Sequence, residues 1–252
     1  MPLAIFSMLH IVSYVFEGLI ILIALEASFG WFNGISMATA PIYEDAPILV
    51  AVILAHALGQ ANSTVAHLVF QDAFTSIALG RPSKYFLANI SRSDADLDTV
   101  HRLFGSRLLH RLIIGHWKAF GENDNVTREL ASFALKHNIE VDDERYDRKM
   151  FAIAFSKAAI DKDFMESTQP LLVNFNFSRN MFCAFLLSFV LLATSDAWKM
   201  AMSEGETNFL TEFSFLATFL VVMLVLFRRY LYFMGVFTKS VLVHLVAPGH
   251  SG

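Results

Sequence analysis

The stretch Leu54–Asp72, LAHALGQANSTVAHLVFQD, decides how the whole chain is interpreted. It lies in an apolar run of span length, yet its residues 56–67 include two histidines, two side-chain amides and two hydroxyls. About 20 apolar residues are needed to cross roughly 30 Å of hydrocarbon. Polar side chains inside such a span usually face the interior of a helix bundle or an aqueous path. The first question is therefore whether the chain is a membrane protein.

Composition indicates a membrane protein. The chain has 252 residues, of which 55% are hydrophobic and only 17% are charged, against about 25% charged residues in soluble domains. Four segments are almost free of charge: 2–25, 47–70, 181–195 and 213–227. The last two segments reach span length only when the polar residues that flank them are included. The sequence therefore predicts an all-α, polytopic membrane protein with four transmembrane helices.

The distribution of basic residues predicts the orientation. Of the nineteen Lys and Arg residues, fifteen lie in 71–180, three follow residue 227 and one lies in 196–212. By the positive-inside rule, both termini and the central segment are predicted to face the cytoplasm. Trp31 and Trp198 then both lie at the outer interface, where aromatic residues gather. The first segment lacks a positive N-terminal region and carries Glu17, so we interpret it as an uncleaved span.

The spans divide the chain in a 2 + 2 arrangement. The predicted domains are 1–71 with spans one and two, 72–178 as a helical cytoplasmic domain, 179–230 with spans three and four, and 231–252 as an amphipathic cytoplasmic tail. The central domain shows helical spacing of apolar residues and no long alternation of period two. Asn125 or Thr127 is the expected N-cap of one of its helices.

Polar residues form a stripe on the second span and a shorter one on the first. On the second span they recur at i, i+4, i+7 and i+11, which is one helical face. An intramembrane carboxylate is itself a functional-site hypothesis. The candidate pore-lining residues are His10, Glu17, His56, Gln60, Ser63, Thr64 and His67. The alternative is that these groups only hydrogen-bond between helices, at about 0.6–2 kcal/mol each.

The central domain contains one locally basic, acid-free segment, 101–118. Its candidate ligand-binding residues are Arg102, Arg107, His110, Arg111 and Lys118. Three interpretations stay open. The segment binds anionic lipid headgroups, it binds the phosphates of a nucleotide or nucleic acid, or it pairs with the acidic residues of 140–147.

Motifs for chemistry are absent from the sequence. There is no H-E-x-x-H, G-x-S-x-G, P-loop or C-x-x-C, and Cys183 is the only cysteine. His56 and His67 lie about 16 Å apart along a helix, too far to share one metal ion. We therefore predict no catalytic residue, no metal site and no cofactor, and a protein that is not an enzyme.

Three stretches carry a resemblance to known proteins: LGRPSKYF (79–86), FNFSRNMFCAFLLSFVLL (175–192) and FRRYLYFMGVFTKSV (227–241). They resemble a family of uncharacterised bacterial four-span membrane proteins, which implies a fold but no catalytic residues. In architecture the chain is also similar to membrane effectors of anti-phage defence, including nucleotide-gated effectors and the Hailong-type channel restrained by an oligonucleotide.

These observations predict an oligomeric inner-membrane channel or membrane-disrupting effector, gated by a nucleotide or oligonucleotide on the cytoplasmic domain. Four helices per chain are too few to enclose a wide pore, which implies a symmetric homo-oligomer, with a tetramer as the expected state. Two rival functions remain: a membrane scaffold that recruits a partner protein, such as one encoded in the same operon, and a lipid-modifying enzyme.

Overall fold

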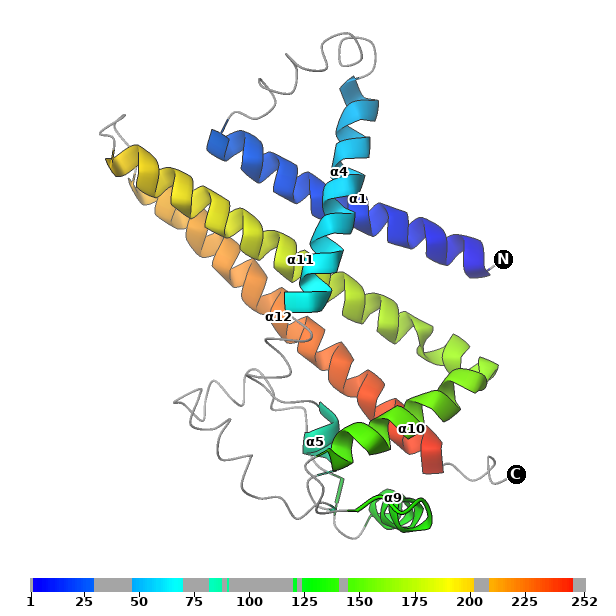
Figure 1. Ribbon diagram of the computed structural model, residues 1–252. Coiled ribbons are helices and arrows are strands. Elements are labelled where there is room, and N and C mark those ends of the chain that lie inside the picture. The colour runs from blue at the N-terminus through cyan, green and yellow to red at the C-terminus, as the bar shows by residue number, and fades with distance from the viewer. Residues whose placement is uncertain are drawn as a thin grey trace. The chain divides into compact units, whose positions relative to one another are not determined.

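A computed structural model describes residues 2–29, 47–69, 82–87, 90, 120–121, 124–140, 145–201 and 209–246. These residues are almost entirely helical, and no strand occurs among them, which confirms the predicted all-α class. The helices are α1 (Pro2–Phe29), α4 (Pro47–Val65), α5 (Pro82–Phe86), α9 (Asn125–Lys136), α10 (Tyr146–Ile160), α11 (Lys162–Ala201) and α12 (Phe209–Val246) (Figure 1).

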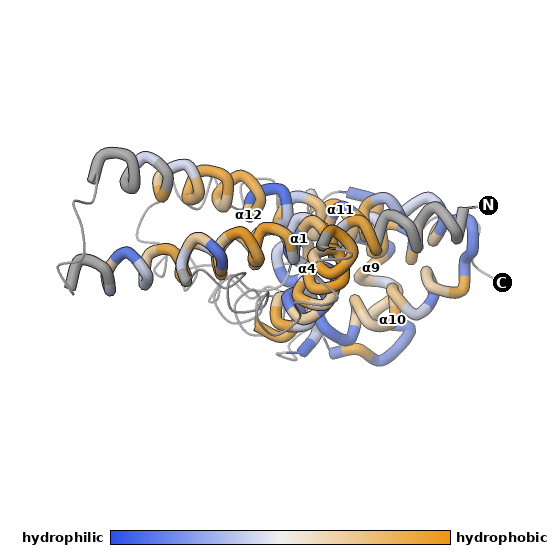
Figure 2. Tube along the Cα trace, turned by 90° about the horizontal axis from the view of Figure 1, so that it is seen from above, coloured by the Kyte–Doolittle hydropathy of each residue, from blue (hydrophilic) through white to orange (hydrophobic). Residues whose placement is uncertain are grey.

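Four of these helices are long and apolar enough to cross a membrane, which confirms the predicted count. The candidate spans are Ile11–Ser28, Ile48–Val69, Lys162–Trp198 and Leu216–Val246. Figure 2 shows the hydrophobic residues that dominate these helices. Their length and composition match those of membrane spans, which makes the chain a multi-pass membrane protein.

The last two helices extend well beyond the apolar segments that mark them in the sequence. α11 has 40 residues and α12 has 38, which at 1.5 Å per residue is about 60 Å, twice the hydrocarbon thickness. The predicted tail boundary after residue 230 lies inside α12, because the helix continues unbroken to Val246.

The chain divides into two compact units. The first contains Met1–Gln71 and Phe177–Phe227, and the second contains Asp72–Asn176 and Arg228–Gly252. α11 and α12 each contribute one part to each unit. That the second unit is cytoplasmic remains a prediction.

In the first unit, α1 and α4 cross at very close range (Figure 1). A Cβ atom on Gly18 would overlap the backbone carbonyl of Ala55, and one on Gly59 would overlap the backbone carbonyl of Tyr14. Small residues at a crossing let two membrane helices approach closely and gain van der Waals contact. The two glycines therefore set the distance between these helices.

α11 packs beside α1 and α12 within the same unit. Ser188 donates a hydrogen bond to the carbonyl of Ile20 at 3.4 Å, and Ser195 donates to the carbonyl of Ser28 at 2.9 Å. Aromatic side chains fill the contact between α11 and α12, where the ring centroids of Phe182 and Phe227 lie 5.1 Å apart.

The second unit has a small core on α10, in which Tyr146, Met150, Ala154 and Ala158 recur every four residues and are buried. The N-cap of α9 is Asp124, so the predicted cap at Asn125 or Thr127 is wrong. Both residues lie inside the first turn of the helix. The Thr127 hydroxyl donates instead to the carbonyl of Gly121 at 2.7 Å, which ties the turn before α9 to the helix.

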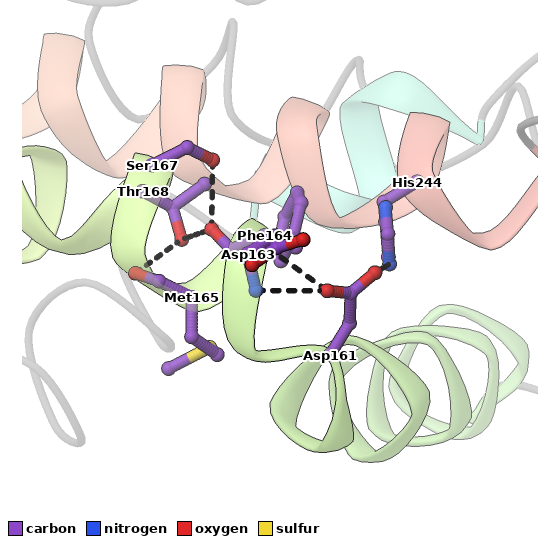
Figure 3. A network of polar contacts seen from close by, with 7 residues as sticks. All are labelled: Asp161, Asp163, Phe164, Met165, Ser167, Thr168 and His244. Carbon is purple, nitrogen blue, oxygen red and sulfur yellow. Dashed lines mark hydrogen bonds and ion pairs between the residues drawn. The ribbon is translucent and has the colours of Figure 1, made fainter.

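Asp161 organises the corner between α10 and α11, also in the second unit (Figure 3). Its carboxylate accepts the backbone N–H groups of Asp163 at 3.0 Å and Phe164 at 3.1 Å, which caps the start of α11. The other carboxylate oxygen lies 3.4 Å from His244 Nε2, and the His244 ring stacks on Phe164. This contact fastens the end of α12 to the α10–α11 corner.

Candidate functional site

A cluster of polar side chains joins α1, α4 and α11 inside the first unit, and Glu17 is its most buried member. The Glu17 side chain is 0% exposed. Ser13, one turn earlier on α1, donates its hydroxyl to Glu17 Oε1 at 2.7 Å. Asn62 of α4 donates its Nδ2 to Glu17 Oε2 at 3.3 Å. One carboxylate oxygen of Glu17 therefore has a hydrogen-bond donor from α1 and the other has a donor from α4.

The cluster continues from α4 to α11. Asn62 Nδ2 also donates to the backbone carbonyl of Asn180 at 2.9 Å. Asn180 Nδ2 donates to Ser63 Oγ at 3.0 Å, while its Oδ1 accepts two N–H groups of Arg179 at 3.1 and 3.0 Å. The side-chain amide of Asn180 thus connects a hydroxyl on α4 with a guanidinium on its own helix.

Arg179 also belongs to this cluster. Its side chain is only 5% exposed and donates to Asn180 Oδ1. Leaving a buried polar group without its hydrogen-bond partner typically costs about 1–3 kcal/mol. The hydrogen bonds that link Glu17, Asn62, Ser63 and Asn180 therefore hold α1, α4 and α11 in one arrangement.

The local sequence explains why the polar groups meet. Asn62 shares one face with Ala55 and Gly59 of α4 and with Ala66, which directly follows that helix, and all four residues are buried. Because the apolar members of this face are small, neighbouring helices come close enough for the Asn62 amide to reach both of them.

The predicted polar stripe on α4 lies beside this buried face rather than on it. A buried residue directly precedes each of His56, Gln60, Ser63 and His67, and one residue along a helix is a rotation of about 100°. Gln60, Thr64 and His67 are exposed, whereas His56 and Ser63 are half-buried. The ring of His56 contacts the Gln60 side chain, with 3.0 Å between His56 Nε2 and Gln60 Nε2.

Sequence reasoning missed the residues that form the centre of the cluster. None of Ser13, Asn62, Arg179 and Asn180 was among the predicted site residues. A usable signal was the face of small residues around Asn62, which marks the packed side of a membrane helix. Glu17 was found, but the structure places it in the packed interior of a single chain, so its pore-lining role stays a prediction.

The other predicted site residues are not placed in the same detail. His10 lies in α1, and its side chain is outside the described residues. The predicted ligand-binding residues, Arg102, Arg107, His110, Arg111 and Lys118, all lie outside the described residues as well.

The polar groups of the cluster hydrogen-bond to one another and so stabilise the packing of the three helices. Glu17 accepts hydrogen bonds from Ser13 and Asn62, and within the part of the chain that the structure describes no group of three His, Cys, Asp or Glu residues is arranged to hold a metal ion.

Comparison of the chain with protein-family models, curated proteins and solved structures finds no match.

Proposed function

We propose that the chain is one subunit of a homo-oligomeric ion channel or membrane-disrupting effector, in which the exposed polar face of α4 lines the path. The observation that supports this most directly is the exposure of Gln60, Thr64 and His67 on a helix of membrane length. Polar groups in contact with hydrocarbon are costly, so such a face is normally covered by protein or water.

The buried cluster supports this proposal because it fixes the rotation of α4 about its own axis. The bonds from Asn62 to Glu17 and from Asn180 to Ser63 turn one side of α4 into the bundle. The exposed polar residues Gln60, Thr64 and His67 are then held outward. A second copy of α4 beside the first brings together amide, hydroxyl and imidazole groups, each of which can both donate and accept hydrogen bonds.

A symmetric ring, with a tetramer as the expected state, brings one α4 from each subunit to the axis. We place the protein in a bacterial inner membrane with both termini and the second unit in the cytoplasm. Opening is controlled by a nucleotide or oligonucleotide bound through the basic segment 101–118, in the context of anti-phage defence and with a partner protein encoded nearby. This part of the proposal rests on charge pattern and resemblance alone.

Crosslinking in membranes tests the oligomer. In a Cys183→Ala background, Gln60→Cys is expected to form dimers on mild oxidation, because the stripe faces its own copy. Val65→Cys is the matched control, since Val65 is 50% exposed but points to a different side of α4. Equal crosslinking at both positions, or none at Gln60→Cys, contradicts an interface on the polar face.

Ion flux from liposomes tests the path. Gln60→Leu/His67→Leu is expected to reduce flux by about tenfold or more, because a hydrophobic lining dewets a narrow pore. Val65→Leu/Val69→Leu, on exposed apolar positions, should leave flux unchanged. Absence of flux in the wild-type oligomer, with and without ATP or a short single-stranded oligonucleotide, overturns the channel and favours the scaffold or lipid-modifying enzyme.

The gating step has its own variant. Arg107→Glu/Arg111→Glu should abolish the response of flux to the nucleotide or oligonucleotide while leaving membrane insertion and crosslinking intact. A normal response in this variant removes segment 101–118 from the mechanism without affecting the assignment of the path.

A further inference from the structure

Two adjacent arginines mark the end of the charge-free part of α12. Residues 213–227 carry no charge, and Arg228 and Arg229 follow immediately, both with exposed side chains. Fifteen helical residues rise about 22 Å, most of the hydrocarbon thickness, so a helix of this pattern carries the two guanidinium groups to the level of the lipid headgroups.

Arg229 is held in place by its neighbours. Its Nη2 donates to Asn174 Oδ1 at 3.0 Å, and its guanidinium carbon lies 5.5 Å from the centre of the Phe233 ring. Asn174 is itself oriented, because its Nδ2 donates to the carbonyl of Pro170 at 2.8 Å. A side chain ordered in advance loses less conformational entropy when it binds a ligand.

Among the described residues, no acidic side chain neutralises the positive charge of the pair. Within the described ranges, neither Arg228 nor Arg229 has a carboxylate within salt-bridge distance. The guanidinium of arginine presents a planar fork of N–H donors that matches the oxygens of a phosphate. Tyr232 is 48% exposed and stands one turn after Arg228 on the same face, with the amphipathic ring typical of a membrane interface.

Apolar positions one turn earlier complete the surface. Val221, Leu224 and Val225 are exposed by 58%, 56% and 61%, and the last two lie four residues before Arg228 and Arg229. α12 therefore presents, along one side, an apolar strip that ends in two cations and a tyrosine. A soluble anion would contact only the two cations. A phospholipid would contact the cations with its phosphate and the apolar strip with its acyl chains.

We propose that Arg228, Arg229 and Tyr232 form a binding site for an anionic phospholipid. The two guanidinium groups bind the headgroup phosphate, and the acyl chains lie along Val221, Leu224 and Val225. Asn174 is a positioning residue that keeps Arg229 directed to the headgroup. This site does not depend on the proposed channel, since it uses none of the residues of the α4 face.

The test is lipid binding to the full-length protein in detergent, followed by native mass spectrometry with phosphatidylglycerol and phosphatidylcholine. The wild type is expected to bind phosphatidylglycerol about tenfold or more tightly than phosphatidylcholine. Arg228→Gln/Arg229→Gln should weaken phosphatidylglycerol binding by about 30-fold. It should weaken phosphatidylcholine binding much less, because the choline ammonium already offsets the charge of that lipid's phosphate. Arg128→Gln/Lys162→Gln removes two exposed charges elsewhere in the second unit and should change neither.

Three outcomes overturn the proposal: equal binding of the two lipids by the wild type, unchanged lipid binding in the double arginine variant, or displacement of phosphatidylglycerol by inorganic phosphate at equal concentration. The last result would indicate a site for a soluble anion. Asn174→Leu adds a variant that keeps both charges, and it should weaken phosphatidylglycerol binding by a few-fold only, because it frees Arg229 without removing it.

Discussion

Individual buried residues in this chain differ in how well their polar atoms are satisfied. Tyr146 is 2% exposed, and its hydroxyl has no hydrogen-bond partner among the described residues. Burial raises the pKa of this tyrosine to about 12, from an ordinary value near 10. A buried hydroxyl without a partner costs about 1–3 kcal/mol, so Tyr146 contributes through its ring and not through its hydroxyl.

Replacing Tyr146 by Phe should therefore stabilise the second unit. We expect the free energy of unfolding to rise by about 1 kcal/mol at pH 8, because the ring is kept and the unsatisfied hydroxyl is lost. Thermal unfolding followed by far-UV circular dichroism measures the change. A loss of stability of similar size would mean that the hydroxyl has a hydrogen-bond partner. Met150→Ala, which opens a cavity in the same core, is the destabilising reference variant.

The same variant has a predicted pH dependence. Because the folded-state pKa is raised, the stability linked to this group is fully present below pH 10 and is lost as the pH rises towards 12. Tyr146→Phe should lose less stability than the wild type between pH 9 and 11. Tyr85, whose pKa is also raised to about 12, contributes the same trend in both proteins and so does not mask the difference.

Asn62 shows why the site could be predicted only in part. Helical periodicity places His56, Gln60, Ser63 and His67 on one face, but polarity leaves open whether that face turns into the bundle or towards an aqueous path. Which face is buried depends on how closely another backbone can approach, and the small residues around Asn62 decide that. The partners of Asn62 are 45 and 118 residues away in sequence, and a periodic pattern carries no information about such distant contacts.

At the scale of helices, the α1–α4 crossing depends on two glycines. Gly18→Ala should separate the helices, because its Cβ would overlap the backbone of Ala55 and backbone atoms cannot turn aside as a flexible side chain can. We expect a loss of about 1–3 kcal/mol, the usual cost of overpacking. The fall in the unfolding temperature of the protein in detergent measures it.

Gly121→Ala is the matched control for this prediction. A Cβ there meets only the Asp124 side chain at 3.8 Å, which is an ordinary contact. The same Gly→Ala change should therefore leave the unfolding temperature nearly unchanged. Equal behaviour of the two variants would show that α1 and α4 are not in close contact in the folded protein.

The sequence predicted the membrane helices well and their ends poorly. Apolar length identifies a span because lipid requires it. The apolar length does not determine where the helix begins or ends, because outside the bilayer a helix needs only its internal hydrogen bonds and one packed side. Thus α11 begins at Lys162, capped by Asp161, well before the apolar segment at residue 181. Such an extension is fixed by local capping and by packing in the second unit.

At the scale of the whole molecule, the number of spans and the orientation of the chain in the membrane are independent predictions. With four spans, both ends of the chain are expected on one side of the membrane, and the connections between spans one and two and between spans three and four on the other. The excess of Lys and Arg in 71–180 then predicts that the side with both ends of the chain is the cytoplasm. A single experiment can test both predictions.

Cysteine labelling with a membrane-impermeant maleimide separates the two predictions. In a Cys183→Ala background, which removes the only native cysteine, we expect Asn33→Cys and Ser203→Cys to react in intact spheroplasts. Ser106→Cys and Ser251→Cys should react only after permeabilisation. Labelling of one outer-loop cysteine without the other contradicts four spans, because the two loops must share a side. Protection of both, with labelling of Ser106→Cys, keeps the four spans and reverses the orientation, so that the basic segment would face away from any cytoplasmic nucleotide.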